Sequence, residues 1–511
     1  MTGARGRRDA LVFIGFMGAG KTSAARAVAA ELGVVAVDSD AVIEEQLGSS
    51  IETYFASHGE REFREREEAV VLELLERPPS PVISLGGGAI ASDRVRQALA
   101  RHTVVLLDVD ADTAWQRAGG RRPLARDRKR FNELLAARAP LYESLADAVL
   151  PNSRREAIRQ ALPALRSLDD APEGTRLLWA ETAGAAYPVY IGEGLLASGF
   201  WPVTGTRFVV SDDHVEQAHG GLLAPDATIT PGERHKTLGA VESVLRSMAA
   251  AGLDRGAHVA AFGGGVVGDT AGFCAAVYQR GIAVVQVPTT LVAQVDSAYG
   301  GKTGVDLPEG KNYAGAFHQP AAVLADPSLL ATLPPAELAA GWAEVIKTAL
   351  IAGGALWKRV RDSAAVDRDL IVSCARTKLG VVAMDERDEG RRQVLNLGHT
   401  TGHAIETATS YTRYRHGEAV GLGLLAACTL ADRVALRSEV AGLLERHGLP
   451  TQLDDAVELE PVIAAVGRDK KRRDGGPVPF VLPICAGDVR TGCQVGDAEL
   501  AAALEELRRA P

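Results

Sequence analysis

Three histidines with a spacing suited to metal binding lie in the C-terminal third of the chain: His399, His403 and His416. The first two are four residues apart, so on a helix they would share one face. Neutral imidazole nitrogens combined with one carboxylate make a three-ligand metal site that leaves a position open for a substrate. The spacing predicts a catalytic metal centre, with a group of ordinary core histidines as the alternative.

A second and unrelated chemistry is predicted near the N-terminus. Residues 15–22 read G-x-x-x-x-G-K-T, follow an apolar run at 10–14 and precede a helical pattern at 23–32. In this order of strand, glycine turn and helix, backbone N–H groups bind phosphates at the helix N-terminus. Lys21 would reach the β and γ phosphates, and Thr22 would bind Mg²⁺. One chain therefore carries two candidate active sites.

The composition describes a globular protein with more than one domain. A chain of 511 residues is too long for one core, and 46% hydrophobic with 24% charged residues is typical of globular proteins. The net charge of −9 predicts no nucleic-acid partner. Five cysteines without a C-x-x-C pair predict a cytoplasmic protein, and no apolar run is long enough for a membrane span.

Changes of pattern along the chain predict the domain organisation. Helical apolar spacing ends near residue 165, and turn-forming residues follow at 167–174. Strands then alternate with helices, and from residue 333 the sequence is helical and rich in Ala and Leu. We expect an α/β protein, with a phosphate-loop domain of parallel sheet and flanking helices at 1–170 and a linker at 171–179. A second enzyme at 180–511 would have a Rossmann-like nucleotide-binding half (180–330) and an α-helical metal-binding half (331–511).

Charged residues follow the predicted strands of the first domain. Asp38 and Asp40 come after an apolar run at 34–37, where carboxylates in an open α/β sheet point into the ligand crevice. Asp38 could hold a Mg²⁺ water, and Asp40 could accept a hydrogen bond from a substrate hydroxyl. Further on, basic segments at 119–124 and 138–142 could close over negative charge that develops during phosphoryl transfer.

These segments resemble the shikimate kinase family over residues 9–167, through G-x-x-G-x-G-K-[ST], D-[ST]-D, E-F-R, L-G-G-G and R-A-P-L-Y. The resemblance implies ATP with Mg²⁺ as cofactor, and a lid, shorter here than is common, that brings Arg122 onto ATP. The nucleotide would be bound by Gly18, Ala19, Gly20, Lys21, Thr22 and Ser23. Shikimate would be bound by Asp40, Arg64, Gly86, Gly87, Gly88 and Arg138, and of these Asp40 and Arg138 would act with Lys21 in catalysis. Another small-molecule kinase, for gluconate or adenylate, is the alternative.

A second nucleotide signature lies in the following region. An apolar run at 259–262 leads into the glycine turn Gly263–Gly268, which suits a pyrophosphate against backbone N–H groups, with a simple packing turn as the alternative. The three histidines still need a carboxylate to complete a divalent-metal site, and Glu344 on an Ala-rich helix is our choice. Lys347, Lys378 and Arg392 beside an open metal position would suit a phosphorylated, hydroxylated acid.

Residues 180–500 resemble the 3-dehydroquinate synthase family along their whole length. The resemblance implies NAD and Zn²⁺, or Co²⁺, with Glu344, His399 and His416 as metal ligands. The residues alone would make His403 a ligand too, but the resemblance assigns it to the substrate. The residues implied for substrate or catalysis are Arg280, Asp296, Lys302, Asn312, Lys347, Lys378, Arg392, Asn396, His403, and Lys470 or Lys471. Those implied for NAD are Asp212, Glu233, Lys236, Gly264, Gly265, Asp269, Thr289, Thr290, Lys302, Lys311 and Thr332.

The reaction implied for this second region is a cyclisation without net oxidation. NAD oxidises a ring hydroxyl of a seven-carbon keto acid phosphate, phosphate leaves by β-elimination, the hydride returns and an aldol closure gives 3-dehydroquinate. A homodimer through the synthase region is compatible with this interpretation. The alternatives are a sugar-phosphate cyclase that makes another carbocycle, a metal-dependent polyol dehydrogenase, and a degenerate domain that only binds ligands.

Overall fold

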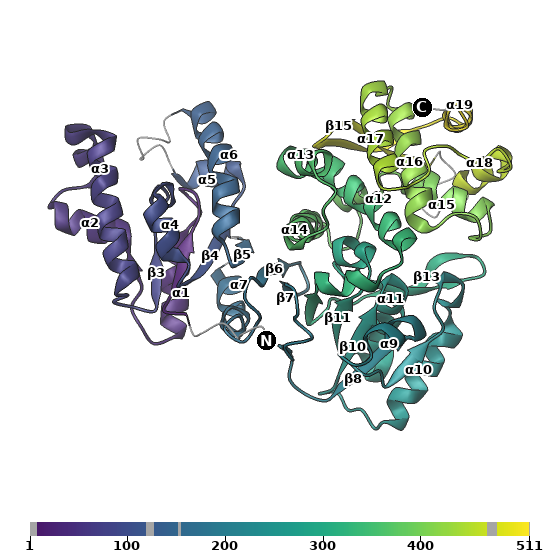
Figure 1. The fold of residues 1–511 in the computed structure, drawn as a ribbon, viewed down its shortest axis with the longest axis horizontal. Coiled ribbons are helices and arrows are strands. Elements are labelled where there is room, and N and C mark those ends of the chain that lie inside the picture. Colours follow the sequence, from purple (N-terminus) through teal and green to yellow (C-terminus); the bar gives the residue numbers. More distant parts are fainter. Residues whose placement is uncertain (1–7, 119–126, 152–154, 468–477, 510–511) are drawn as a thin grey trace. The chain divides into compact units, whose positions relative to one another are not determined.

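The computed structural model describes residues 8–118, 127–151, 155–467 and 478–509, and the chain divides into two compact units. Unit 1 comprises Met1–Glu181 and Ala186–Pro202, and unit 2 comprises Thr182–Ala185 and Val203–Pro511. Both units are built on mostly parallel sheets with flanking helices, which confirms the predicted α/β class (Figure 1). No helix in the described part of the chain combines the length and the apolar character that a membrane crossing needs.

Unit 1 contains the strand order β2-β3-β1-β4-β5-β6-β7, parallel up to β6 and antiparallel between β6 and β7. Buried aliphatic residues of β1 and β4 form the centre of its core. The strands are β1 Leu11–Ile14, β2 Val37–Asp38, β3 Val82–Ser84, β4 Thr103–Asp108, β5 Ala148–Pro151, β6 Arg176–Glu181 and β7 Ala186–Ile191. The expected linker at 171–179 thus includes the start of β6, which pairs with β5.

The first helix of unit 1 follows a tight glycine turn. α1 starts at Lys21, directly after a turn in which Gly15, Gly18 and Gly20 have positive φ angles. A side chain at Gly18 would collide with the carbonyl of Ala114, so the turn requires glycine there. The helices are α1 Lys21–Glu31, α2 Ser39–Leu47, α3 Ile51–Glu76, α4 Asp93–Leu99, α5 Ala111–Ala118, α6 Arg128–Leu145, α7 Arg155–Gln160 and α8 Leu162–Ser167.

The first half of unit 2 is a parallel sheet of order β14-β11-β10-β8-β9 with helices packed on it. The strands are β8 Arg207–Asp212, β9 Ala227–Ile229, β10 His258–Gly263, β11 Ala283–Pro288 and β14 Ala322–Ala325. The helices and turns are α9 Asp213–His219, η3 Glu233–His235, α10 Leu238–Ala250, α11 Gly265–Val277, η4 Tyr278–Arg280, the π-helix η5 Ala293–Ser297 and η6 Pro327–Thr332. A hairpin of β12 Lys302–Leu307 and β13 Gly310–Phe317 follows η5.

The second half of unit 2 is mainly helical, as predicted, and occupies the green to yellow part of Figure 1. Its elements are α12 Pro335–Ala352, α13 Gly354–Asp362, α14 Arg368–Met384, η7 Arg391–Asn396, α15 His399–Ala408, α16 His416–Leu430, α17 Val434–Arg446, α18 Leu459–Gly467, β15 Pro479–Cys485, β16 Asp488–Gln494 and α19 Asp497–Leu507. Helix α16 packs closely on its neighbours. A side chain at Gly417 would collide with the Ala340 carbonyl of α12, and one at Gly423 with the Gly398 carbonyl that precedes α15. These close approaches hold α12, α15 and α16 together.

Candidate functional site

The phosphate loop of unit 1 has the geometry that its sequence predicts. Lys21 lies at the N-terminus of α1, and its Nζ donates to the carbonyl oxygens of Gly15 at 3.0 Å and Phe16 at 3.2 Å. Thr22 Oγ1 donates to Asp38 Oδ2 at 2.5 Å. The adjoining cleft of about 290 Å³ is lined by Gly18, Gly20, Lys21, Thr22, Ser23, Asp38, Asp40, Ser84, Leu85 and Arg117. Arg117, at the end of α5, was not predicted.

The residues predicted to bind the phosphate acceptor lie around the glycine turn Gly86–Gly88, which follows β3. Asp38 caps α2, accepting from the Asp40 N–H at 3.0 Å, and the Gly86 N–H donates to Ser39 Oγ at 2.8 Å. A side chain at Gly86 would collide with the Asp40 carboxylate, and one at Gly88 with the guanidinium of Arg64. The absence of a side chain at these two positions lets the three segments converge.

Glu67 and Tyr142, which were not predicted as site residues, also contact this group. Glu67, three residues after Arg64 on α3, accepts from Arg64 Nη1 at 2.5 Å and is buried. Burial raises the pKa of Glu67, and Arg64 and Arg138 lower it in part. Arg138 Nη1 and the Tyr142 hydroxyl both donate to the Gly87 carbonyl, at 3.1 and 2.5 Å. The signal for Glu67 was its spacing from Arg64 on one helix face.

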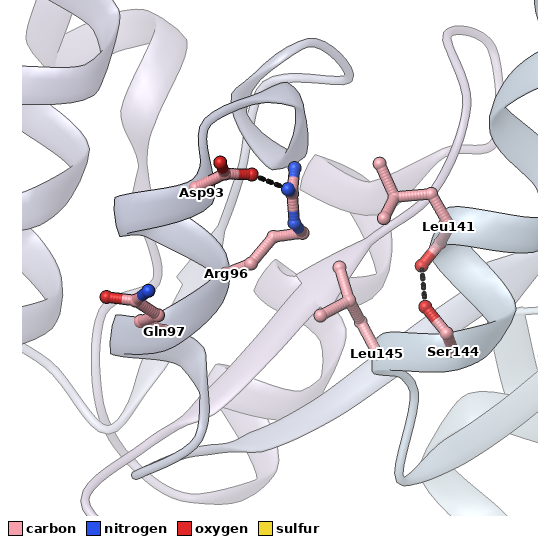
Figure 2. Close-up of a pocket in the computed structure, with 6 residues that line it drawn as sticks. All are labelled: Asp93, Arg96, Gln97, Leu141, Ser144 and Leu145. Atoms are coloured by element: carbon pink, nitrogen blue, oxygen red, sulfur yellow. Dashed lines mark hydrogen bonds and ion pairs between the residues drawn. The ribbon is translucent and has the colours of Figure 1, made fainter.

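A second hollow in unit 1, of about 360 Å³, lies between α4 and α6 (Figure 2). Figure 2 shows Arg96, which pairs with Asp93 on α4, facing the apolar side chains of Leu141 and Leu145 on α6. Ser144 uses its hydroxyl to donate to the Leu141 carbonyl at 2.9 Å. No predicted site residue lines this hollow, and none of the residues that line it also lines the phosphate-loop cleft.

Three helices of unit 2 build the candidate metal centre. Glu344 of α12, His399 of α15 and His416 of α16 offer ligand atoms that lie within 4.8 Å of one another. Both histidine Nε2 atoms are 3.5 Å from Glu344 Oε1. Glu344 is buried, and neither of its carboxylate oxygens has a hydrogen-bond partner among the described residues, although Lys347 makes an ion pair with it. Two imidazole nitrogens and one such carboxylate fit zinc or cobalt.

His403 lies beside this group. Its ring centroid is 5.2 Å from that of His399 and 5.8 Å from that of His416, and it forms a second potential ligand group with Glu406 and His416. Burial lowers the pKa values of His399 and His403 well below the usual range. Burial thus favours the neutral form of both imidazoles, which is the form that binds metals.

Two buried ammonium groups converge on one carboxylate next to the histidines. Lys347 Nζ is 2.6 Å from Asp296 Oδ2, while Lys378 pairs with Oδ1 of the same residue and donates to its carbonyl at 2.8 Å. Burial raises the pKa of Asp296, but the two lysines outweigh it and hold the pKa well below its usual range. Burial lowers the pKa of Lys378, and Asp296 offsets this effect only in part. Arg392 is also buried, and its Nη2 donates to the Gly300 carbonyl at 3.0 Å.

The predicted nucleotide residues surround the turn between β10 and α11. A side chain at Gly264 would press on Thr290, and one at Gly265 would press on Ser297 of η5, one residue after Asp296. Across the β12–β13 hairpin, Lys236 pairs with Asp269 at 2.6 Å and donates to Asn312 Oδ1 at 2.7 Å. Lys311 lies 3.2 Å from Glu233. Asp212 caps α9, and Thr332 contacts His219, which was not predicted.

The remaining predicted residues of unit 2 make fewer contacts with the metal group, with the Asp296–Lys347–Lys378 group and with the nucleotide turn. Lys302 is half-exposed and pairs with Asp388 at 2.6 Å, Asn396 ends η7, and the buried Thr289 hydroxyl has no partner among the described residues. Arg280 is exposed at the far end of α11. Arg122, Lys470 and Lys471 lie outside the described residues.

Fold and sites together define a class of protein: a phosphate-loop kinase unit joined to an enzyme with a nucleotide-binding sheet and a His₂-carboxylate metal centre. The family models agree with this division. Residues 17–168 match shikimate kinase, residues 226–340 match the 3-dehydroquinate synthase N-terminal model, and residues 341–472 match the C-terminal model.

Individual relatives support the same assignment. The chain is 46% identical over 337 residues to the 3-dehydroquinate synthase of Halorhodospira halophila, covering 61% of this chain and 94% of the relative. It is 42% identical over 354 residues to that of Symbiobacterium thermophilum, covering 63% and 98%.

A solved structure of 2-epi-5-epi-valiolone synthase from Streptomyces hygroscopicus, with NAD⁺ and Zn²⁺ bound, is 29% identical, with a TM-score of 0.59 over 63% of this chain and 97% of that one. A 2-deoxy-scyllo-inosose synthase with carbaglucose-6-phosphate, NAD⁺ and Co²⁺ is 26% identical, with a TM-score of 0.58 over 65% and 99%.

The chain belongs to the 3-dehydroquinate synthase family and carries a shikimate kinase domain before the synthase region. Both are enzymes of the shikimate pathway that act on small molecules, as the sequence predicts.

Proposed function

We propose that the phosphate-loop cleft phosphorylates shikimate with ATP and Mg²⁺. In unit 2, we propose conversion of 3-deoxy-D-arabino-heptulosonate 7-phosphate into 3-dehydroquinate and phosphate. The observation that carries the proposal is the convergence of each set of site residues in one unit. Asp40, Arg64 and Arg138 meet the Gly86–Gly88 turn, and Glu344, His399 and His416 lie beside the buried Asp296–Lys347–Lys378 group.

In the kinase site, the residues position phosphates and the acceptor hydroxyl. Lys21 exchanges its carbonyl partners for phosphate oxygens, while Thr22 and Asp38 hold Mg²⁺, Asp38 through a water. Asp40 accepts the hydrogen bond of the shikimate hydroxyl that is phosphorylated, and Arg64 and Arg138 bind the carboxylate. Glu67 holds the Arg64 guanidinium in place.

In the synthase site, Glu344, His399 and His416 would hold the metal ion, which would supply Lewis-acid polarisation of a substrate oxygen, and NAD would supply a reversible hydride transfer. Asp296 fixes Lys347 and Lys378 where their positive charge can bind the acidic substrate. The phosphate of the substrate itself can take the proton from carbon, so the protein mainly orients the reacting groups.

A homodimer through the synthase region is part of the proposal, and Arg280 supports it. Gly265 at the N-terminus of α11 faces Ser297 of η5, whereas the exposed Arg280 follows the opposite end of this 13-residue helix. A helix of that length is about 20 Å long, beyond the reach of an arginine side chain. If Arg280 binds substrate, a second copy must present it. Mixing inactive Arg280→Ala and His399→Ala chains should then restore part of the synthase activity. If the chain does not dimerise, the mixture should remain inactive.

We also propose that the enzyme works in the cytoplasm, because its five cysteines are free thiols and three of them are buried. Another sugar-phosphate cyclase remains the second candidate for unit 2, since solved cyclases with other products share its fold. The higher identity to 3-dehydroquinate synthases favours our choice.

The test is to identify products made by the purified full chain. With the heptulosonate phosphate, NAD and Zn²⁺ we expect 3-dehydroquinate and phosphate without accumulation of NADH. With shikimate and ATP we expect shikimate 3-phosphate. A different carbocycle would support another cyclase, accumulation of NADH with glycerol would support a polyol dehydrogenase, and an inert kinase unit would support a degenerate domain.

A further inference from the structure

Glu406 is a buried carboxylate of α15 that neither site assignment uses. It lies one turn after His403, and its Oε1 is 3.4 Å from Nδ1 of His416. The other ring nitrogen of His416, Nε2, faces Glu344 Oε1 at 3.5 Å. The two nitrogens of His416 therefore face two different carboxylates, one inside the candidate metal group and one outside it.

Glu406 also pairs with a charged residue of the nucleotide region. Its Oε1 is 3.4 Å from Lys311 Nζ, which is in turn 3.2 Å from Glu233. Glu406 therefore lies between His416 of the metal group and Lys311 of the β12–β13 hairpin.

Glu406 could in principle be a ligand itself, because His403, Glu406 and His416 also lie within 4.8 Å of one another. However, one imidazole ring cannot direct both of its nitrogens at the same ion. A metal bound to Glu344, His399 and Nε2 of His416 leaves the Nδ1 proton of His416 for a carboxylate. Such carboxylate–histidine pairs fix the tautomer and orientation of a metal-binding ring and raise its basicity.

We propose that Glu406 is a positioning residue for the metal centre: its carboxylate accepts the Nδ1 proton of His416 and so directs Nε2 at the ion. The inference rests on the proposed metal ligands. Positioning partners of this kind change metal affinity by about 10–100-fold when they are removed. Glu406→Leu should therefore weaken zinc binding by that factor, while Glu406→Gln, which keeps an acceptor oxygen, should weaken it less.

The test measures the zinc affinity of the full chain by competition with a chromogenic chelator, alongside the visible spectrum of the Co²⁺-loaded protein. Glu418→Gln is the matched control, because it changes a carboxylate of α16 that pairs with Arg415. Its zinc affinity should stay within twofold of the unmodified chain. At saturating Co²⁺, the Glu406 variants should keep the wild-type spectrum, because the three residues that bind the ion directly are unchanged. An unchanged spectrum also verifies that the site has folded.

Three results would overturn the proposal. Zinc affinity of Glu406→Leu within twofold of wild type would mean that Glu406 does not position the ligand. Equal losses in Glu406→Leu and Glu406→Gln would mean that only its charge acts, and an altered Co²⁺ spectrum would make it a ligand. Failure of the metal assignment is recognised separately, since His416→Ala would then retain zinc.

Discussion

The two active sites of this chain are assembled in different ways. In unit 1, the site residues come from short segments that follow β1, β2 and β3, together with α3 and α6, and these segments carry recognisable motifs. In unit 2, the described site residues span 212–416 and come from helices, a hairpin and a π-helix that are far apart in sequence. The kinase site is therefore defined mainly by local sequence, and the synthase site by tertiary packing.

Charge pairing shows the same contrast. Lys21 and Arg138 of the kinase site donate to backbone carbonyls, which are weak partners that a phosphate or carboxylate can replace, whereas Arg64 pairs with the buried Glu67. The ammonium groups of Lys347 and Lys378 are buried against Asp296. Removing one member of a buried group leaves an uncompensated charge, so synthase variants should lose more than kinase variants. The predictions below test that difference.

The largest effect is expected at the metal ligands. His399→Ala and His416→Ala should each abolish bound zinc and reduce synthase activity to background, a loss of several kcal/mol of transition-state stabilisation. His403→Ala should keep zinc but turn over slowly, because we assign it to the substrate. Metal analysis of the three purified variants checks this. If His403→Ala empties the site, the ligand set includes the histidine pair four residues apart.

The next effect concerns the kinase site. Lys21→Ala should lower the kinase kcat by about 10²–10³-fold, because one preorganised cation that faces the transferred phosphate is lost. Asp40→Asn should cost about 10²–10⁴-fold if it assists the transfer of the hydroxyl proton. Steady-state assays with shikimate and ATP measure both, with circular dichroism to verify folding. A normal rate in Asp40→Asn would remove this residue from the acceptor site.

A smaller effect is expected at Glu67. Glu67→Gln should raise the KM for shikimate about tenfold, equivalent to about 1.4 kcal/mol, because Arg64 loses its buried, closer carboxylate partner and keeps the exposed Glu60 at 3.4 Å. The KM for ATP should not change. Glu68→Gln is the control, since Glu68 pairs with Ser92 and Arg94 instead. Equal effects on both substrates would show that Glu67 supports the fold of α3 and not the orientation of Arg64.

The smallest effect is expected from separating the enzymes. Fragments 1–202 and 175–511 should each keep the kcat/KM of the full chain within about threefold, under about 1 kcal/mol. Fragment 1–170 should be less stable than 1–202, because it lacks the β6–β7 pair that extends the sheet beyond β5. Thermal unfolding compares the two kinase fragments. Loss of more than tenfold in one activity, with recovery on adding the other fragment, would contradict independent function.

The sequence predicted the α/β class and the phosphate loop from its motifs. The ligand set Glu344, His399 and His416 followed from the resemblance to the synthase family, because helical spacing alone pairs His399 with His403, and it stays a prediction. The sequence did not predict Glu406 or Asp388. Their partners His416 and Lys302 are 10 and 86 residues away along the chain, and no spacing rule relates them. Arg117 was missed because its place at the cleft depends on the packing of α5 against the phosphate loop, where the Ala114 carbonyl lies close to Gly18.

The central claim, that one chain holds two separate active sites, is tested most directly by assaying both reactions in Lys21→Ala and His416→Ala. We predict that Lys21→Ala loses shikimate phosphorylation and keeps synthase turnover near wild type, and that His416→Ala shows the reverse. Loss of both activities in either folded variant would contradict the claim.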